Sequence, residues 1–155
     1  DRRYTMAFLK SFKYAFMGVK YCIATQRNFR FHTFAALSAV ILACRYGLSG
    51  IEKLVLAFTI VFVLISEMFN TALESVVDMT AKGYNDYAKA AKDVAAGAVL
   101  ISAITAALTG IILFYNHGHF WTVLFEYLTT PLFWVYIAFG FLYVSGVLFE
   151  IRRKK

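Results

Sequence analysis

The sequence has little of what stabilises a small soluble domain or marks a common nucleotide site. Of its 155 residues one is proline, two are cysteine and only 16% are charged. Cys22 and Cys44 form no CxxC pair, and they would lie about 33 Å apart along one helix at 1.5 Å per residue. Neither a disulfide framework nor a zinc site is therefore predicted. The motif GxxxxGK[ST] and a glycine-rich kinase loop are both missing, so any nucleotide site has another design.

The composition instead predicts a protein whose solvent is a lipid bilayer. Hydrophobic residues make up 61% of the chain and the mean hydropathy is +0.64, which is more apolar surface than one domain of this size can bury. The formal net charge is +7. Because the positive residues cluster beside apolar runs, this charge indicates membrane topology, and no nucleic-acid partner is expected.

The first segment, from residue 4 to about residue 25, is predicted to be an amphipathic helix lying on an anionic membrane surface. Its large apolar residues recur every three or four positions, at Phe8, Phe12, Phe16, Val19 and Ile23. Lys10, Lys13 and Lys20 lie off that stripe and interrupt the apolar positions. For this reason we expect no cleaved signal peptide here.

Four membrane spans are predicted after the surface helix, at residues 31–46, 51–79, 93–115 and 132–149. A turn at 45–53 separates the first two, and a polar segment at 81–92, which is either a loop or a frayed extension of the helix, separates the second from the third. Small residues recur every four positions in the third span and form a seam for a neighbouring helix, at Ala98, Ser102, Ala106 and Gly110. The histidines of the 116–119 turn are expected to lie in a solvated loop, and residues 120–127 at the membrane interface. We expect a membrane domain at 1–119 and an additional helix at 120–155.

The positive charges predict the orientation of these spans. Four spans put both termini on one side, together with fourteen of the sixteen positive residues, which leaves only Arg45 and Lys53 on the other. By the positive-inside rule, both termini and the 81–92 loop are cytoplasmic. Glu67 then lies about 24 Å into a core of about 30 Å, near the cytoplasmic interface.

Glu67, Asn70, Glu74 and Asp78 are spaced by three, four and four residues, so they share one face of the second span. We call them the polar face. Carboxylates one turn apart can hold Mg²⁺ with substrate phosphates, and a partly desolvated carboxylate can act as a general base. The same acids could line a proton or cation path, or form a structural polar cluster between subunits. The spacing alone leaves these alternatives open. His32 is expected to be an interfacial side chain.

Two motifs resemble the small prokaryotic diacylglycerol kinase family, which includes the undecaprenol kinases of Gram-positive bacteria. Residues 67–78 read EMFNTALESVVD, and residues 91–100 read AKDVAAGAVL. The family signature is E-x-x-N-[ST]-A-[IL]-E-x-V-V-D, followed after a short loop by A-K-D and a helix of small residues. The similarity extends upstream through FKYAFMG at 12–18 and RNFRFH at 27–32, and covers about residues 10–115.

The resemblance implies an all-α integral membrane protein and an ATP-dependent lipid kinase. Each chain would give an amphipathic surface helix and three family transmembrane helices to a homotrimer with shared active sites, and the fourth span is an addition to that plan. By matched position, Glu67 is implied as the catalytic base and Glu74 as a ligand of Mg²⁺. The residues implied to arrange ATP are Tyr14, Asn70, Asp78, Lys92 and Asp93.

One departure from the family pattern concerns the metal. The family's second metal carboxylate falls at Gln26 here, and a neutral amide brings no charge, so weaker metal affinity is expected. We therefore predict a bacterial cytoplasmic-membrane kinase that uses MgATP to phosphorylate a lipid alcohol. Diacylglycerol and undecaprenol both remain open as its substrate, with a slight preference for undecaprenol. The alternatives are a small cation or proton conductor and a non-catalytic membrane scaffold.

Overall fold

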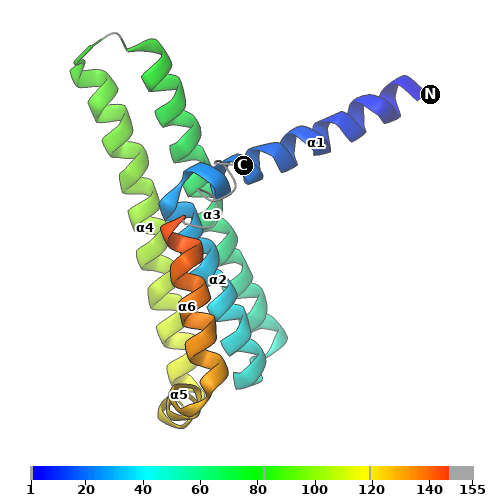
Figure 1. The fold of residues 1–155 in the computed structure, drawn as a ribbon, viewed down its shortest axis with the longest axis vertical. Coiled ribbons are helices and arrows are strands. Elements are labelled where there is room, and N and C mark those ends of the chain that lie inside the picture. The colour runs from blue at the N-terminus through cyan, green and yellow to red at the C-terminus, as the bar shows by residue number, and fades with distance from the viewer. Residues whose placement is uncertain (1, 82, 119, 147–155) are drawn as a thin grey trace.

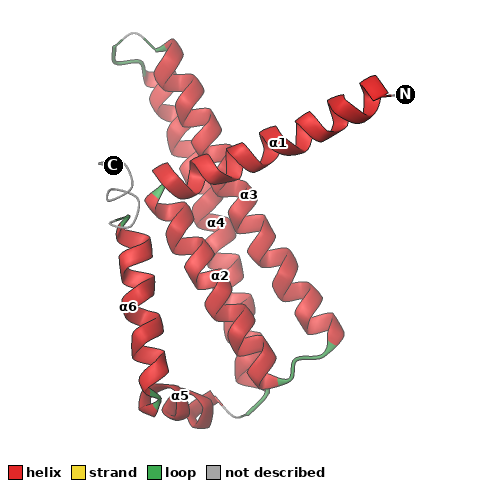
Figure 2. Ribbon diagram, turned by 45° about the vertical axis from the view of Figure 1, so that its right-hand side comes forward, coloured by secondary structure: helices red, strands yellow, loops and turns green. Residues whose placement is uncertain are grey.

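The computed structural model describes residues 2–81, 83–118 and 120–146, and all regular structure in these ranges is helical. The six helices are α1 (Arg2–Thr25), α2 (Arg27–Tyr46), α3 (Gly50–Thr80), α4 (Asp86–Asn116), α5 (Phe120–Thr129) and α6 (Pro131–Ser145). Figure 1 shows α2, α3, α4 and α6 running along a common direction, with α1 projecting away from them. α5 lies across the end of the bundle that is distant from α1 (Figure 2).

Two helices, α3 and α4, are long and apolar enough to cross a membrane. Each has 31 residues, about 46 Å at 1.5 Å per residue, which exceeds a hydrocarbon core of about 30 Å. Large apolar side chains on their outer surfaces are exposed, among them Phe58, Phe62, Ile101 and Ile111. Such a surface suits lipid, and the predicted all-α membrane protein is confirmed. The number of spans stays a prediction, since α6 is a shorter apolar helix of 15 residues.

Local signals in the sequence explain where the long helices begin and end. Gly47 ends α2 in the left-handed conformation, at a φ of 65° that favours glycine. Ser49 and Glu52 then form a capping box at the start of α3, in which each side chain bonds the other's backbone N–H. Asn85 caps α4 by accepting hydrogen bonds from the backbone N–H groups of Tyr87 and Ala88 at 2.9 and 3.1 Å.

Three predicted boundaries were wrong. The turn predicted at 45–53 is shorter, because α2 continues to Tyr46 and the Ser49 cap starts α3 at Gly50. The non-helical part of residues 81–92 is short, because the Asn85 cap starts α4 at Asp86, seven residues before the predicted start at 93. The fourth span was predicted to continue to residue 149, but α6 ends at Ser145, where Gly146 adopts a left-handed conformation at a φ of 82°.

Some features named from the sequence lie outside the described structure: Lys82, His119, residues 147–155 with their basic end, and the side chains of Arg2, Arg3 and Tyr127.

α3 and α4 pack along each other and are joined by polar contacts at three levels, one of which is an ion pair between Lys92 and Asp78. Ser66 and Ser102 share a hydrogen bond of 2.9 Å between their hydroxyls, and Ser102 is buried. The predicted small-residue seam on α4 is thus confirmed at Ser102 as a place of close helix contact. Nearer the α5 end, His117 Nε2 lies 3.1 Å from Glu52 Oε1. His117 therefore has a bonding role and is not the solvated loop residue that the sequence predicted.

The C-terminal helix α6 packs along α2 through several specific contacts. A Cβ atom added to Gly140 would lie 2.2 Å from the ring of Phe34, so only glycine allows this approach. Tyr143 shares a hydrogen bond of 3.0 Å with Thr33. Buried Arg30 donates from Nε to the Val144 carbonyl at 3.2 Å. These contacts fix α6 against α2 within a single chain.

Arg30 also holds the surface helix. Its Nη1 donates to the backbone carbonyls of Ile23 and Ala24, at 3.1 and 3.4 Å, in the last turn of α1. Carbonyls at a helix C-terminus lack intrahelical partners and carry partial negative charge, so a guanidinium stabilises them. One buried side chain on α2 thereby binds the ends of both α1 and α6.

Candidate functional site

The polar face of α3 runs from a buried residue to an exposed one. Glu67 is only 2% exposed, Asn70 and Glu74 are half-buried, and Asp78 is exposed. Asn70 Nδ2 donates to Glu74 Oε1 at 2.9 Å, so the predicted shared face is confirmed for this pair. A solute approaching the free end of the α3–α4 hairpin meets Asp78 first, and Glu67 lies deepest.

Two buried oxygens on the polar face have unused acceptor capacity. Glu67 Oε1 and Asn70 Oδ1 are inaccessible to solvent, and neither accepts a hydrogen bond from any residue that the structure describes. Unsatisfied buried polar atoms are costly, and native proteins retain them where a ligand, an ion or catalysis uses them. These oxygens therefore mark the place where a donor group of a substrate or a metal ion would be stabilised.

His32 is a neighbour of Glu67 that was not predicted from the sequence. His32, on the first turns of α2, was expected to be an interfacial side chain, but its Nε2 lies 3.2 Å from Glu67 Oε1. The distance is that of an ion pair, although the atoms are not aligned as a hydrogen bond. The two residues are 35 positions apart, so helical periodicity within one segment could not reveal this contact.

The last turns of α1 complete the surroundings of Glu67. Cys22 is buried at 4% exposure, and the Thr71 hydroxyl, which is also buried, donates to the Glu67 backbone carbonyl at 2.9 Å. Burial raises the pKa of the Cys22 thiol, and a hydrogen bond with Thr71 offsets part of that rise. The thiol is therefore neutral at physiological pH and a poor nucleophile. Both cysteines are free, as the sequence predicted.

The second motif meets the first across the hairpin. Lys92 Nζ forms an ion pair with Asp78 Oδ1, which joins α4 to the outer end of the polar face. The Asn85 cap places Lys92 in the second turn of α4, and the adjacent Asp93 is exposed. A cation held beside carboxylates at a solvent-accessible end suits the binding of a phosphate and its counterion.

Two predicted site residues are not joined to the polar face within this chain. Gln26 is half-buried at the junction of α1 and α2, and Tyr14 is 66% exposed on the projecting part of α1 (Figure 1). Among the described residues, neither makes a hydrogen bond or ion pair with Glu74. The roles predicted for Gln26 and Tyr14 stay predictions.

The oxygen atoms of the polar face can be compared with the ligands that Mg²⁺, the metal implied by the resemblance, prefers. No group of three or more histidine, cysteine, aspartate or glutamate side chains in the described ranges could hold a metal ion by itself. Mg²⁺ is usually bound through one or two carboxylates together with substrate phosphates. Glu74 and the buried amide oxygen of Asn70 are hard oxygen donors of this kind. The residues present therefore fit a Mg²⁺ ion that arrives with a phosphate ligand.

Fold and site together define an all-helical membrane protein with a carboxylate-rich polar face near one end of its longest helices. Comparison with known families narrows this class, because the model of the prokaryotic diacylglycerol kinase family matches residues 13–114. The chain belongs to that family. Residues 115–155, which include α5 and α6, lie outside the matched region.

Three curated relatives illustrate the similarity. A diacylglycerol kinase of Synechocystis is 52% identical over 103 residues, which are 66% of this chain and 59% of the relative. An undecaprenol kinase of Bacillus subtilis is 38% identical over 107 residues, 69% of this chain and 87% of the relative. A diacylglycerol kinase of Escherichia coli is 33% identical over 109 residues, 70% of this chain and 89% of the relative. The match thus spans less than two thirds of the Synechocystis protein.

Proposed function

We propose that this protein is a lipid kinase, which transfers the γ-phosphate of ATP to the hydroxyl of a lipid alcohol in a bacterial cytoplasmic membrane. The observation that carries the proposal is Glu67, a buried carboxylate whose Oε1 accepts no hydrogen bond from the described residues, at the deep end of a polar face that leads to solvent. Membership of the prokaryotic diacylglycerol kinase family supports the same activity.

In the proposed mechanism Glu67 accepts the proton of the lipid hydroxyl. The hydroxyl oxygen then attacks the γ-phosphorus, the bond to the bridging oxygen breaks, and ADP leaves. Burial favours this role because a buried carboxylate acts on the hydroxyl away from competing water. The contact with His32 holds the carboxylate toward α2.

Glu74, assisted by Gln26, is proposed to hold Mg²⁺. Bound there with ATP, the ion would neutralise phosphate charge. Lys92 and Asp78 lie at the exposed end of the same face, where the nucleotide would approach. Asp93 is the residue after Lys92 and is also exposed. Asn70 orients Glu74 through its amide hydrogen bond.

Tyr14 is proposed to contact the nucleotide from α1. Since the described chain does not bring Tyr14 to the polar face, this role requires a neighbouring subunit. The proposed homotrimer, with active sites shared between subunits, meets that requirement. The exposed apolar surfaces of α3 and α4 leave room for such helix packing.

The proposed orientation puts the polar face at the cytoplasmic interface, with both termini on the cytoplasmic side. The positive-inside rule supports it, since Arg45 and Lys53 are the only positive residues at the opposite end among those that the structure describes. ATP is available on the cytoplasmic side, and a lipid hydroxyl reaches the interface from the bilayer. Both substrates could therefore meet at Glu67.

The lipid substrate is proposed to be diacylglycerol, with undecaprenol as the second candidate. The sequence motifs slightly favoured undecaprenol, but the 52% identical relative is named a diacylglycerol kinase and the relative named an undecaprenol kinase is 38% identical. Both lipids present one hydroxyl on long apolar chains. A direct assay must therefore compare them.

A cation or proton conductor is less well supported. Conduction requires polar groups across the whole bilayer. In the half of α3 before Glu67, residues 54–64 contain only Thr59 as a polar side chain, and its hydroxyl donates to the Leu56 carbonyl at 2.9 Å. That hydroxyl bond is local to the helix, so no continuous path is formed along this face.

The deciding experiment uses purified protein in detergent with Mg²⁺, ATP labelled at the γ-phosphate, and a panel of lipid alcohols. Labelled phosphatidic acid is the expected product from diacylglycerol. A panel in which no lipid becomes labelled would show that the proposed activity is wrong. Stronger labelling of undecaprenol than of diacylglycerol would instead correct the substrate.

A further inference from the structure

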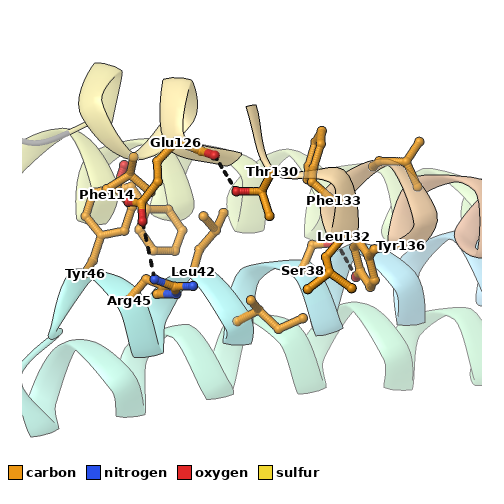
Figure 3. Close-up of a pocket in the computed structure, with 13 residues that line it drawn as sticks. Ser38, Leu42, Arg45, Tyr46, Phe114, Glu126, Thr130, Leu132, Phe133 and Tyr136 are labelled. Carbon is orange, nitrogen blue, oxygen red and sulfur yellow. Dashed lines mark hydrogen bonds and ion pairs between the residues drawn. The ribbon is translucent and has the colours of Figure 1, made fainter. Parts of the chain in front are cut away.

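A cavity of about 520 Å³ lies at the end of the bundle that is far from the polar face (Figure 3). Helices α2, α5 and α6 supply most of its lining and the end of α4 supplies the rest. The apolar residues that line it include Ile41, Leu42, Phe114, Val123, Leu132 and Ile137. Its volume is in the range of pockets that bind small molecules.

Two polar contacts mark the limits of the cavity along α2. Ser38 and Tyr136 share a hydrogen bond of 2.9 Å between α2 and α6. Arg45 Nη1 lies 3.8 Å from Glu126 Oε1 of α5, and both side chains are about two-thirds exposed. Figure 3 shows Leu42 between these two links, with Phe114 near the Arg45–Glu126 pair and Leu132 near the Ser38–Tyr136 pair. Seven residues of α2 separate them, about 10 Å at 1.5 Å per residue.

The surroundings of the cavity decide what can fill it. α5 crosses the end of the bundle beneath it (Figure 2), and Arg45 marks that end as the side opposite the polar face. Apolar cavities exclude water and take up apolar ligands. In a membrane the apolar molecules at this depth are lipid acyl chains, and the Arg45–Glu126 pair gives the cavity a charged mouth.

We propose that the cavity binds one acyl chain of a membrane phospholipid, with the headgroup phosphate beside Arg45. The Arg45 side chain is 63% exposed at the mouth, where its guanidinium is accessible to a phosphate oxygen. One side of the cavity comes from α5 and α6, which lie outside the region matched by the kinase family, and the other side comes mainly from α2, which lies inside it. The C-terminal helices thus give the protein a second lipid site, distinct from the proposed site of phosphorylation.

The proposal rests on the protein being in a membrane and not on its kinase activity. It is tested with the whole chain in lipid nanodiscs, without ATP, using a phospholipid whose acyl chain carries a photoactivatable diazirine. After illumination, mass spectrometry locates the labelled peptides. Labelling is expected to concentrate on the cavity residues of α2 and α6, and the variant Glu67→Gln should label as strongly as the parent protein.

A filled cavity supplies the main comparison. Ile137→Trp places an indole in the cavity and is expected to reduce labelling of its walls about tenfold, since the added volume must be accommodated against a bound chain. Phe141→Trp is the matched control, because Phe141 lies one turn along α6, is 74% exposed and does not line the cavity. It should label like the parent protein. Ile41→Trp obstructs the cavity from α2 and gives a second test if the first variant does not fold.

The headgroup is tested separately with Arg45→Gln. This variant should weaken labelling by the phospholipid and leave labelling by a photoactivatable hydrocarbon without a headgroup unchanged. Equal labelling of all lipid-facing positions of α6, or undiminished labelling in both cavity-filling variants, would overturn the acyl-chain site. Equal phospholipid labelling of Arg45→Gln and the parent would overturn the assignment of the headgroup.

Discussion

His32 Nε2 and Glu67 Oε1 lie 3.2 Å apart, in a contact that joins the start of α2 to the deep end of the polar face on α3. The side chain of Glu67 is almost fully buried and that of His32 is 17% exposed. A buried carboxylate beside a residue that can carry positive charge is a frequent arrangement at catalytic sites.

Glu67→Gln should abolish most of the kinase activity while leaving the fold intact. The substitution keeps the size of the side chain and removes its ability to accept a proton, so we expect kcat to fall by about 10²–10⁴-fold. The measurement is transfer of labelled phosphate to diacylglycerol. Asp86→Asn is the control, since it makes the same chemical change at an exposed position in the first turn of α4. Equal rates for Glu67→Gln and the control would contradict the role of Glu67 as the base.

His32→Gln tests whether His32 positions Glu67. Loss of the imidazole lets the carboxylate shift, and a displacement of about 1 Å can cost up to about 10²-fold in rate. We expect kcat to fall while the KM for ATP stays unchanged, because His32 faces Glu67 and not the exposed end of the site. His117→Gln is the matched control, at the other end of α3. If the KM for ATP rose by a factor similar to the fall in kcat, the substitution would have disrupted the whole site, and His32 would not act by positioning Glu67.

Gln26→Glu should lower the Mg²⁺ concentration needed for the half-maximal rate. A second carboxylate adds negative charge to the proposed metal site, and Mg²⁺ prefers such ligands. Titration of activity against free Mg²⁺ at fixed ATP measures the effect. The control is Asn28→Asp, which adds the same charge two residues away at an exposed position. If both variants shift the titration equally, the effect is only that of local charge and Gln26 is not a ligand.

Arg30→Met should destabilise the protein through both of the helix ends that Arg30 binds. The change leaves the Ile23, Ala24 and Val144 carbonyls without these hydrogen bonds, at about 1–3 kcal/mol for each buried group that finds no other partner. Thermal unfolding in detergent, followed by circular dichroism, is expected to occur at a lower temperature. Arg27→Met serves as the control, because exposed Arg27 should change stability by only about 0.5 kcal/mol.

The proposed orientation can be tested by labelling single introduced cysteines in intact cells. In a variant without Cys44, a membrane-impermeant maleimide added outside the cytoplasmic membrane should react with Lys53→Cys. Lys89→Cys should react only after the membrane is opened, since it lies at the proposed cytoplasmic end of α4. The reverse pattern would show that the polar face is directed away from cytoplasmic ATP.

The sequence alone determined the helices and the chemistry of the polar face. Local rules were sufficient there, because the spacing of Asn70 and Glu74 fixes their relation within one helix and their hydrogen bond follows from it. The second span was predicted to begin near residue 51, and α3 begins at Gly50, where the local capping box of Ser49 and Glu52 sets its start. The start of α4 was missed because the cap at Asn85 was not recognised in the polar stretch that precedes it.

Only the tertiary structure decided which helices meet around that face. The contact of His32 with Glu67 and the three carbonyls bound by Arg30 depend on how separate helices are rotated and placed against one another. Helical periodicity tells which side of a helix is polar, but not which neighbour covers that side. The cavity that Tyr136 helps to line likewise exists only because α6 returns along α2. Contacts between distant residues depend on packing, and packing is a property of the whole fold.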